Sequence, residues 1–162
     1  MVMKILVFSD SHGNTSKMIS AIADHRSSTD LIVHLGDGVR DIEYVSSLYP
    51  EIPVVSIRGN SESYSRENQI IDLGGVRIMC IHGHTYGVKE DLTRAAMSAA
   101  TDECDILLYG HTHMPLDQLF ISPDDRRVRL FNPGSIGKGY PPSYGVVNIA
   151  KNGTFLTSHA YL

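Results

Sequence analysis

The first hundred residues alternate between short apolar runs and segments whose apolar positions recur at helical spacing. The runs at residues 3–8, 31–35 and 54–57 have the length and composition of buried strands. Residues 15–26 and a shorter segment closed by Pro50 and Pro53 lie between them and favour helices, the first capped by Asn14 or Thr15. The inward positions expected on these helices are Met18, Ile19, Ile22 and Ala23, then Ile42, Val45 and Leu48.

The pattern changes after residue 68 and predicts antiparallel hairpins. Residues 69–73 and 76–81 flank a two-glycine turn, and residues 116–121 and 128–131 flank another turn. A third helix over 89–100, with Leu92, Ala95, Ala96 and Ala99 inward, precedes a strand at 106–109, and the last hairpin pairs 146–149 with 155–162. Strand-helix units followed by hairpins predict an α/β fold of mixed sheets with helices outside, and two packed sheets are compatible with it.

The bulk composition is that of an ordinary globular protein. A length of 162 residues predicts one domain, 1–162, and no window is apolar for long enough to span a membrane. The formal net charge of −4, with acidic and basic residues interspersed, argues against tight binding of duplex nucleic acid but leaves small phosphorylated substrates open. Cys80 and Cys104 adjoin apolar runs, as reduced and buried thiols of a cytoplasmic protein do.

Five separate strand ends each carry residues of the kind that bind metal ions. They are Asp10 with His12, Asp37, Asn60, His82, and His111 with His113. Each residue taken alone is an ordinary turn residue, but strands of one sheet end at a common edge, so their joint occurrence predicts a metal site there. An extended backbone would direct the two members of each i, i+2 pair to the same side.

The donor types predict which ions such a site would hold. Carboxylate and amide oxygens combined with imidazoles, without thiolates, match Mn, Zn, Fe, Ni or Co. Seven ligands exceed one tetrahedral ion and suit two ions bridged by a carboxylate, for which Asp37, alone on its loop, is the natural choice. A hydrolase with a single ion would leave Asn60 and one histidine pair unexplained.

The same motifs, in this order, resemble those of the calcineurin-like metallophosphoesterases. They are Asp10-Ser11-His12, Gly36-Asp37, Gly59-Asn60, Ile81-His82-Gly83 and Gly110-His111-Thr112-His113. The short length, the run from His34 to Asp37 and the turn Asn132-Pro133-Gly134-Ser135 resemble most the small bacterial and archaeal phosphodiesterase branch. The resemblance implies a four-layer α-β-β-α sandwich of two mixed sheets flanked by helices, and manganese as the commonest metal.

The resemblance also implies how the ligands divide between two ions. One ion would be bound by Asp10, His12, Asp37 and His113, and the other by Asp37, Asn60, His82 and His111. The expected reaction is hydrolysis of phosphodiesters, and also of activated monoesters, by a hydroxide that the two ions activate. Asn60 could in addition donate its amide to a phosphate oxygen. His82 is preferred to His84 as a ligand because it lies nearer the strand end.

The chain departs from many relatives after Asn60. A histidine beside an acidic residue, acting there as general acid, is replaced by Ser61-Glu62. Serine replaces that acid poorly, so we expect a preference for good leaving groups, with protonation from solvent or from His84.

The remaining polar residues near these motifs receive structural interpretations. His34 is expected to support Asp37 or the sheet by a hydrogen bond. Asp41 is expected on a solvated helix face, and residues 132–135 in a structural turn that could border the site. Tyr140 and Tyr144 could line a substrate edge or a subunit contact, so a homo-oligomer is left open.

One alternative function belongs to a different class of protein. A binding scaffold of the same fold that has lost catalysis would usually also have lost one or more metal ligands. None of the seven expected residues is replaced here, so the enzyme is the preferred interpretation.

Overall fold

The computed structural model describes residues 2–162, which form two five-stranded sheets. The first sheet has the order β10-β9-β1-β2-β3, and the second has the order β4-β5-β6-β8-β7. The strands of the first sheet are β1 (Met3–Phe8), β2 (Leu31–His34), β3 (Val54–Ser56), β9 (Ser143–Ile149) and β10 (Phe155–Tyr161). Those of the second are β4 (Asn68–Leu73), β5 (Val76–Ile81), β6 (Ile106–Leu108), β7 (Leu116–Ile121) and β8 (Arg127–Asn132).

Both sheets are mixed, as expected from a chain that begins with strand-helix units and ends in hairpins. Strands β1, β2 and β3 are parallel neighbours, and so are β5, β6 and β8, whereas the hairpin partners β4, β7, β9 and β10 pair antiparallel. The hairpin between β4 and β5 turns at Gly74 and Gly75, whose φ angles of 60° and 81° match the positive values that this two-residue turn needs. The predicted glycine turn is confirmed.

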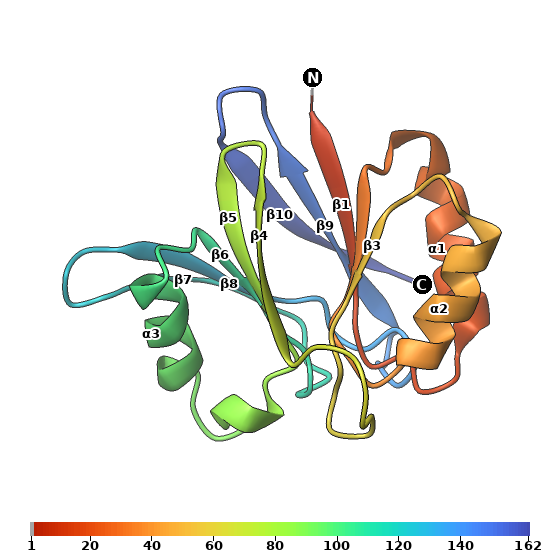
Figure 1. The fold of residues 1–162 in the computed structure, drawn as a ribbon, viewed down its shortest axis with the longest axis horizontal. Coiled ribbons are helices and arrows are strands. Elements are labelled where there is room, and N and C mark those ends of the chain that lie inside the picture. Colours follow the sequence, from red (N-terminus) through yellow and green to blue (C-terminus); the bar gives the residue numbers. More distant parts are fainter. Residues whose placement is uncertain (1) are drawn as a thin grey trace.

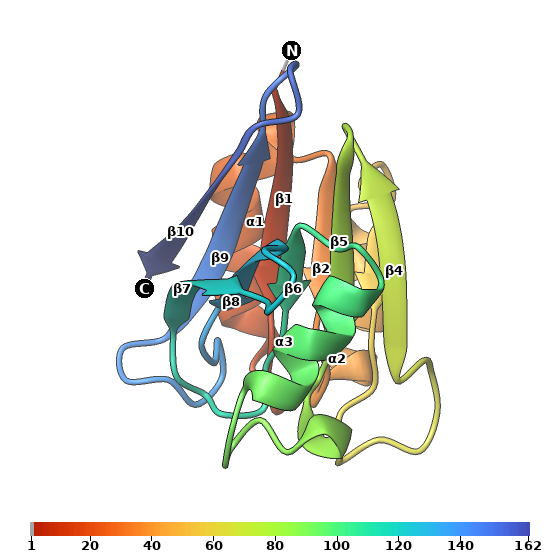
Figure 2. The ribbon, with the colours of Figure 1, turned by 90° about the vertical axis from the view of Figure 1, so that its left-hand side faces the viewer.

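Helices cover the outer face of each sheet. Helices α1 (Thr15–His25) and α2 (Val39–Leu48) lie against the first sheet, and α3 (Thr93–Thr101) lies against the second, on the opposite side of the molecule (Figures 1 and 2). Two short 3₁₀ turns, η1 (Arg26–Ser28) and η2 (His84–Tyr86), complete the described elements. The four-layer α-β-β-α arrangement that the resemblance implied is therefore confirmed, and with it the mixed sheets that the sequence pattern predicted.

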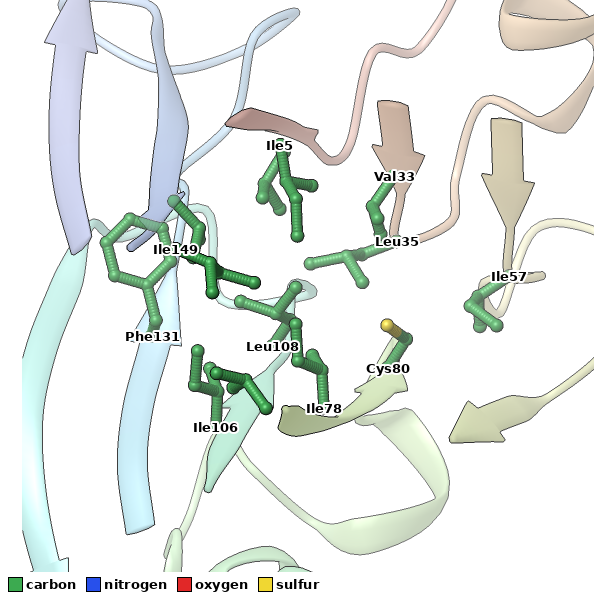
Figure 3. Packing of buried hydrophobic residues seen from close by; sticks show 13 residues of the cluster. Ile5, Val33, Leu35, Ile57, Ile78, Cys80, Ile106, Leu108, Phe131 and Ile149 are labelled. Carbon is green, nitrogen blue, oxygen red and sulfur yellow. The ribbon is translucent and has the colours of Figure 1, made fainter. Parts of the chain in front are cut away.

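The main core lies between the two sheets. Ile5 and Val33 of the first sheet, with Leu35 directly after β2, face Ile78 and Leu108 of the second sheet, and all five are fully buried (Figure 3). Alternate residues of β1 point the other way, so Leu6 and Phe8 pack with Met18 and Ile22 under α1. A third cluster buries the alanine face of α3, including the predicted Ala95, Ala96 and Ala99.

Each of two predicted helix faces contained one wrong residue. Ala23 is exposed and Ala21 is buried instead, because Ala21 lies three residues after Met18 and next to Ile22, on the same face of the helix. On α2, Leu48 is 43% exposed, and Tyr49, four residues after Val45, takes the inward place.

The third helix begins at Thr93, four residues later than predicted. The 3₁₀ turn η2 and Gly87, with a φ of 65°, interrupt the helical geometry, so Lys89 lies in a turn and Leu92 becomes the N-cap.

Within residues 2–162, none of the helices combines the length and the apolar character that crossing a membrane requires.

Candidate metal centre

The seven predicted residues come together at one edge of the molecule. They lie on the loops that follow β1, β2 and β3 of one sheet and β5 and β6 of the other, at the lower edge in Figure 1. Because both sheets direct the carboxyl ends of their parallel strands to the same edge, loops remote in sequence meet there. The structure thus brings together every residue of the set, whose side chains form two overlapping groups.

The first group surrounds Oδ1 of Asp10. His113 Nε2 lies 3.2 Å from this oxygen and His12 Nε2 lies 3.7 Å from it. His12 Nε2 is also 3.7 Å from Oδ2 of Asp37. The side chains of His12 and His113 remain 22% and 34% exposed, so solvent and small molecules reach the cluster from this side.

The second group surrounds Nε2 of His82. This nitrogen lies 3.0 Å from Asn60 Oδ1, 3.1 Å from His111 Nδ1 and 3.6 Å from Asp37 Oδ2. His82 Nδ1 lies 2.7 Å from the backbone carbonyl of Leu35, to which it donates. With its proton on Nδ1, the imidazole presents the free lone pair of Nε2 to the cluster, as a metal-binding histidine does.

The carboxylate of Asp10 leaves one oxygen unused by the protein. Its Oδ2 accepts hydrogen bonds from the Ser9 hydroxyl and from the His111 N–H, but its buried Oδ1 has no hydrogen-bond partner within residues 2–162. A buried acceptor without a partner is costly unless something else satisfies it. Because three imidazole nitrogens lie within 4.0 Å of Oδ1, the residues fit a bound divalent cation.

Asp37 is held as a carboxylate between the two groups. Burial by itself raises its pKa, but hydrogen bonds from Ser61 and the neighbouring His82 and His12 outweigh burial, so the pKa is lowered. The Ser61 N–H and hydroxyl both donate to Oδ1, at 3.1 Å and 2.7 Å, which leaves Oδ2 facing the cluster. One oxygen of Asp37 therefore borders both groups.

Most of the cluster residues have a left-handed backbone, contrary to the extended geometry expected for the i, i+2 pairs. Positive φ values occur at Asp10 (55°), His12 (45°), Asp37 (56°), His111 (67°) and His113 (62°). This conformation costs residues other than glycine about 1–2 kcal/mol each. Backbone hydrogen bonds from Asp10 N to Gly36 O and from His12 N to Asp37 O stabilise it. The side chains converge because the loops curl, and such strain is typical of functional sites.

His84 lies beside the cluster without joining either group. Its ring centroid is 5.4 Å from that of His82 and 6.2 Å from that of His111. Its Nδ1 is buried and has no hydrogen-bond partner in the described chain. Burial, and next the neighbouring His82, lower the pKa of His84, so this imidazole is neutral near pH 7. Of the two rival histidines, His82 is the one placed among the donors.

The turn at residues 132–135 ties two of the cluster loops together, a role that sequence reasoning did not assign. Asn132 Nδ2 donates to Gly110 O and to Thr112 Oγ1, both at 3.0 Å. The Ser135 hydroxyl donates to the backbone oxygen of Asp10 at 2.8 Å. In the sequence, the feature that pointed to such a role was the position of this polar turn directly after a predicted strand.

The two tyrosines after that turn have opposite surroundings. Tyr144 is buried, packs against Phe8 and has its hydroxyl 3.0 Å from His25 Nε2, so it lines no substrate edge. Tyr140 is fully exposed. The expectation for Tyr144 was wrong because the start of β9 turns this residue into the core under α1.

A cavity of about 350 Å³ adjoins the cluster beside His12 and Asp37. Its other lining residues include Arg40, Asp41, Ser61, Glu62 and Tyr64. Asp41 does not lie on a solvated face as predicted, because its Oδ2 accepts hydrogen bonds from the Ser11 hydroxyl and the Gly13 N–H. The volume is in the range of small-ligand sites.

Comparisons with known proteins give the family of the chain. Residues 3–152 match the calcineurin-like phosphoesterase superfamily domain. The chain is 34% identical over 136 residues to a probable metallophosphoesterase of Methanocaldococcus jannaschii, a match that covers 82% of this chain and 68% of that protein. It is 28% identical over 176 residues to the phosphodiesterase YfcE of Escherichia coli K12, a match that covers 91% and 88% of the two chains.

Among solved structures, the fold is similar to that of Vps29 from Entamoeba histolytica in complex with zinc. The TM-score is 0.71 and the identity 18%, with 98% of this chain and 99% of that chain covered. Because the family match spans almost the whole chain and the site has the expected residue types in place, the protein belongs to the calcineurin-like phosphoesterase superfamily.

Proposed function

We propose that the protein is a phosphodiesterase that works with two divalent metal ions. One observation carries the proposal. Asp37 Oδ2 lies 3.7 Å from His12 Nε2 and 3.6 Å from His82 Nε2, so a single carboxylate oxygen borders a donor group on either side. This is the position that a bridging ligand takes between two ions.

The ligand assignment that the resemblance implies is compatible with this arrangement. The first ion would be bound by Asp10, His12, Asp37 and His113, and the second by Asp37, Asn60, His82 and His111. The mixture of oxygen and imidazole donors without thiolate suits Mn, Zn, Fe, Ni or Co, and the resemblance makes Mn the preferred native metal. When bound, two such cations would polarise a phosphoryl oxygen and lower the pKa of a water between them.

The side chains of the protein would orient the phosphate and the metal ligands. Asn60 presents its Oδ1 to the cluster, which leaves its amide hydrogens free to donate to a phosphoryl oxygen. The Leu35 carbonyl keeps the His82 proton on Nδ1 and thereby the Nε2 lone pair toward the second ion. His84 stands next to this group, but its lowered pKa leaves the imidazole neutral near pH 7, so solvent is the better candidate than His84 for protonating the leaving alcohol.

The surroundings of the cluster favour a small substrate. The adjoining cavity of about 350 Å³ accommodates one ester substituent of a small diester. A net charge of −4 and dispersed basic residues do not suit a duplex nucleic acid.

The shared core between the sheets supports one domain, 1–162, while a cytoplasmic location and a homo-oligomer stay predictions from the sequence.

Metal counting coupled to a hydrolysis screen tests the proposal. Protein loaded with Mn²⁺ is freed of unbound metal, its Mn content per chain is measured, and hydrolysis of bis(p-nitrophenyl) phosphate is followed. Cyclic nucleotides and p-nitrophenyl phosphate are assayed in parallel, across several divalent ions. We expect two ions per chain and faster hydrolysis of the aryl diester than of the monoester.

The outcomes separate the alternatives. One ion per chain would contradict the bridged pair and favour the hydrolase with a single ion. Stoichiometric metal without hydrolysis of any ester, or no metal at all, would contradict the enzyme and favour a binding scaffold of the same fold.

A further inference from the structure

Ser11 stands between two residues of the metal centre but turns its side chain away from it. It is fully buried, and its hydroxyl lies 3.0 Å from His34 Nε2 and 2.7 Å from Asp41 Oδ2. His34 is the last residue of β2, and Asp41 belongs to the first turn of α2. The loop after β1, the end of β2 and the first turn of α2 thus meet at one serine hydroxyl.

The direction of each hydrogen bond follows from the partners. His34 Nδ1 accepts the Gly36 N–H at 3.2 Å, so a neutral ring carries its proton on Nε2. Complete burial, only partly offset by Asp10 and Asp41, lowers the pKa of His34 to about 4, so the ring is neutral at pH 7. His34 Nε2–H therefore donates to Ser11, whose single hydroxyl hydrogen donates to Asp41.

Asp41 completes the network by contacting the end of the same loop. Its Oδ2 also accepts the Gly13 N–H at 2.8 Å, so one carboxylate oxygen holds the loop at Ser11 and at Gly13. His12 lies between these two anchored residues. A Cβ on Gly38 would overlap the hydroxyl oxygen of Ser11, so the glycine leaves the room that the Ser11 side chain needs to reach His34 and Asp41.

We propose that Ser11, His34 and Asp41 form a positioning network that holds the loop of Asp10 and His12 in its strained conformation for binding the first ion. The inference rests on the proposed function, because it assigns these residues to one of the two proposed ions. Gly36 and Ser135 also hold the Asp10 end of the loop, but within residues 2–162 the left-handed backbone of His12 itself makes one hydrogen bond, from its N–H to Asp37 O. Residues that orient metal ligands typically contribute about 10–100-fold to metal affinity.

Ser11→Ala tests the network directly. The variant removes only the hydroxyl, and we expect it to bind the first Mn²⁺ about 10–100-fold more weakly in a calorimetric titration, while the second ion changes little. Ser122→Ala is the matched control. Ser122 is also buried, contacts the Asp124 carboxylate and accepts the Arg126 N–H, but it lies in the turn between β7 and β8. The control should bind both ions as the wild type does.

Asp41 provides a second pair of variants, which is useful if Ser11→Ala folds poorly. Asp41 is only partly buried, so Asp41→Ala should fold. Asp41→Ala should weaken the binding of the first ion in the same way, because the Ser11 hydroxyl and the Gly13 N–H both lose the carboxylate oxygen to which they donate. Asp41→Asn retains an acceptor oxygen and should restore most of the affinity, whereas a residue needed only for helix stability would show no such selective recovery.

The hydrogen-bond direction has a test that requires no metal. The ¹⁵N chemical shifts of imidazole-labelled, metal-free protein should show His34 as the neutral form protonated on Nε2. A proton on Nδ1, or equal weakening of both ions in Ser11→Ala, would overturn the network. Wild-type protein that binds no Mn²⁺ would instead contradict the proposed function, so the two failures are distinguishable.

Discussion

His113 Nε2 lies 3.2 Å from Asp10 Oδ1, although the two residues follow strands of different sheets. Asp10 follows β1 in the first sheet, and His113 follows β6 in the second. The donor group around Asp10 is therefore assembled across the sheet-sheet interface. Its geometry depends on the packing of Ile5, Val33 and Leu108 that holds the two sheets face to face (Figure 3).

Loss of Asp37 should empty both metal positions, whereas loss of His113 should affect one. Asp37→Ala removes the oxygen that borders both groups, so its Mn²⁺ content should fall from two ions to nearly none. His113→Ala removes a donor from the first group only and should retain about one ion. Inductively coupled plasma analysis of dialysed protein measures both. Equal metal loss in the two variants would contradict the bridging role of Asp37.

Gly137→Ala should disturb the Asp10 loop by steric overlap. A Cβ at this position would run into the backbone oxygen of Ser11, which cannot move as a flexible side chain can. We expect a loss of about 1–3 kcal/mol in the free energy of unfolding, measured by urea titration, together with weaker Mn²⁺ binding.

Gly75→Ala is the control for that substitution. Gly75 has open space around it but a φ of 81°, so alanine there introduces backbone strain without a clash. It should cost about 1–2 kcal/mol and leave the affinity for Mn²⁺ unchanged. If Gly137→Ala binds metal like Gly75→Ala, the close approach to Ser11 is irrelevant to the site.

His34 should make stability depend on pH between about pH 6.5 and pH 4. Burial, above all, lowers its folded-state pKa to about 4, below the unfolded value near 6.5. The unfolded chain therefore takes up the proton first, and stability falls as the pH drops. Between pH 7.5 and pH 5 the loss from this residue is about 2 kcal/mol.

The His34→Gln variant isolates this contribution. Glutamine has no titrating group but can still donate an N–H toward Ser11. The difference in unfolding free energy between pH 7.5 and pH 5, from urea titrations of metal-free protein, should be smaller in the variant by about 2 kcal/mol. An unchanged difference would mean that His34 is protonated in the fold at pH 5.

Ser61 should make the reaction sensitive to the leaving group. Its hydroxyl is engaged with Asp37 and Glu62, so it offers a poor proton source. Across aryl phosphodiesters, kcat/KM should fall steeply as the pKa of the leaving phenol rises. Ser61→His should flatten this dependence, with at least about a tenfold gain for the poorest leaving groups relative to Ser61→Ala. Parallel slopes in both variants would show that position 61 takes no part in protonation.

The sequence was sufficient to predict the secondary structure elements and the polar residues that follow the strands. Apolar periodicity located the strands and the three long helices, because burial of one face demands those patterns. It also identified the polar residues at the five strand ends, since the polar side chains follow buried strands directly. The predicted helix faces were wrong where either of two nearby residues could continue the apolar face, as with Ala21 and Ala23.

The tertiary structure decided how these parts meet. The resemblance grouped Asp10 with His113 and the residue pattern favoured Asp37 as the bridge. Only the fold shows that His113 reaches Asp10 from the other sheet and that Asp37 turns one oxygen to both groups. Likewise, the roles of Ser11, Asp41 and Ser135 depend on partners far away in the chain. Residue types and periodicity are local properties, whereas donor distances and hydrogen-bond partners arise only when packing brings distant loops together.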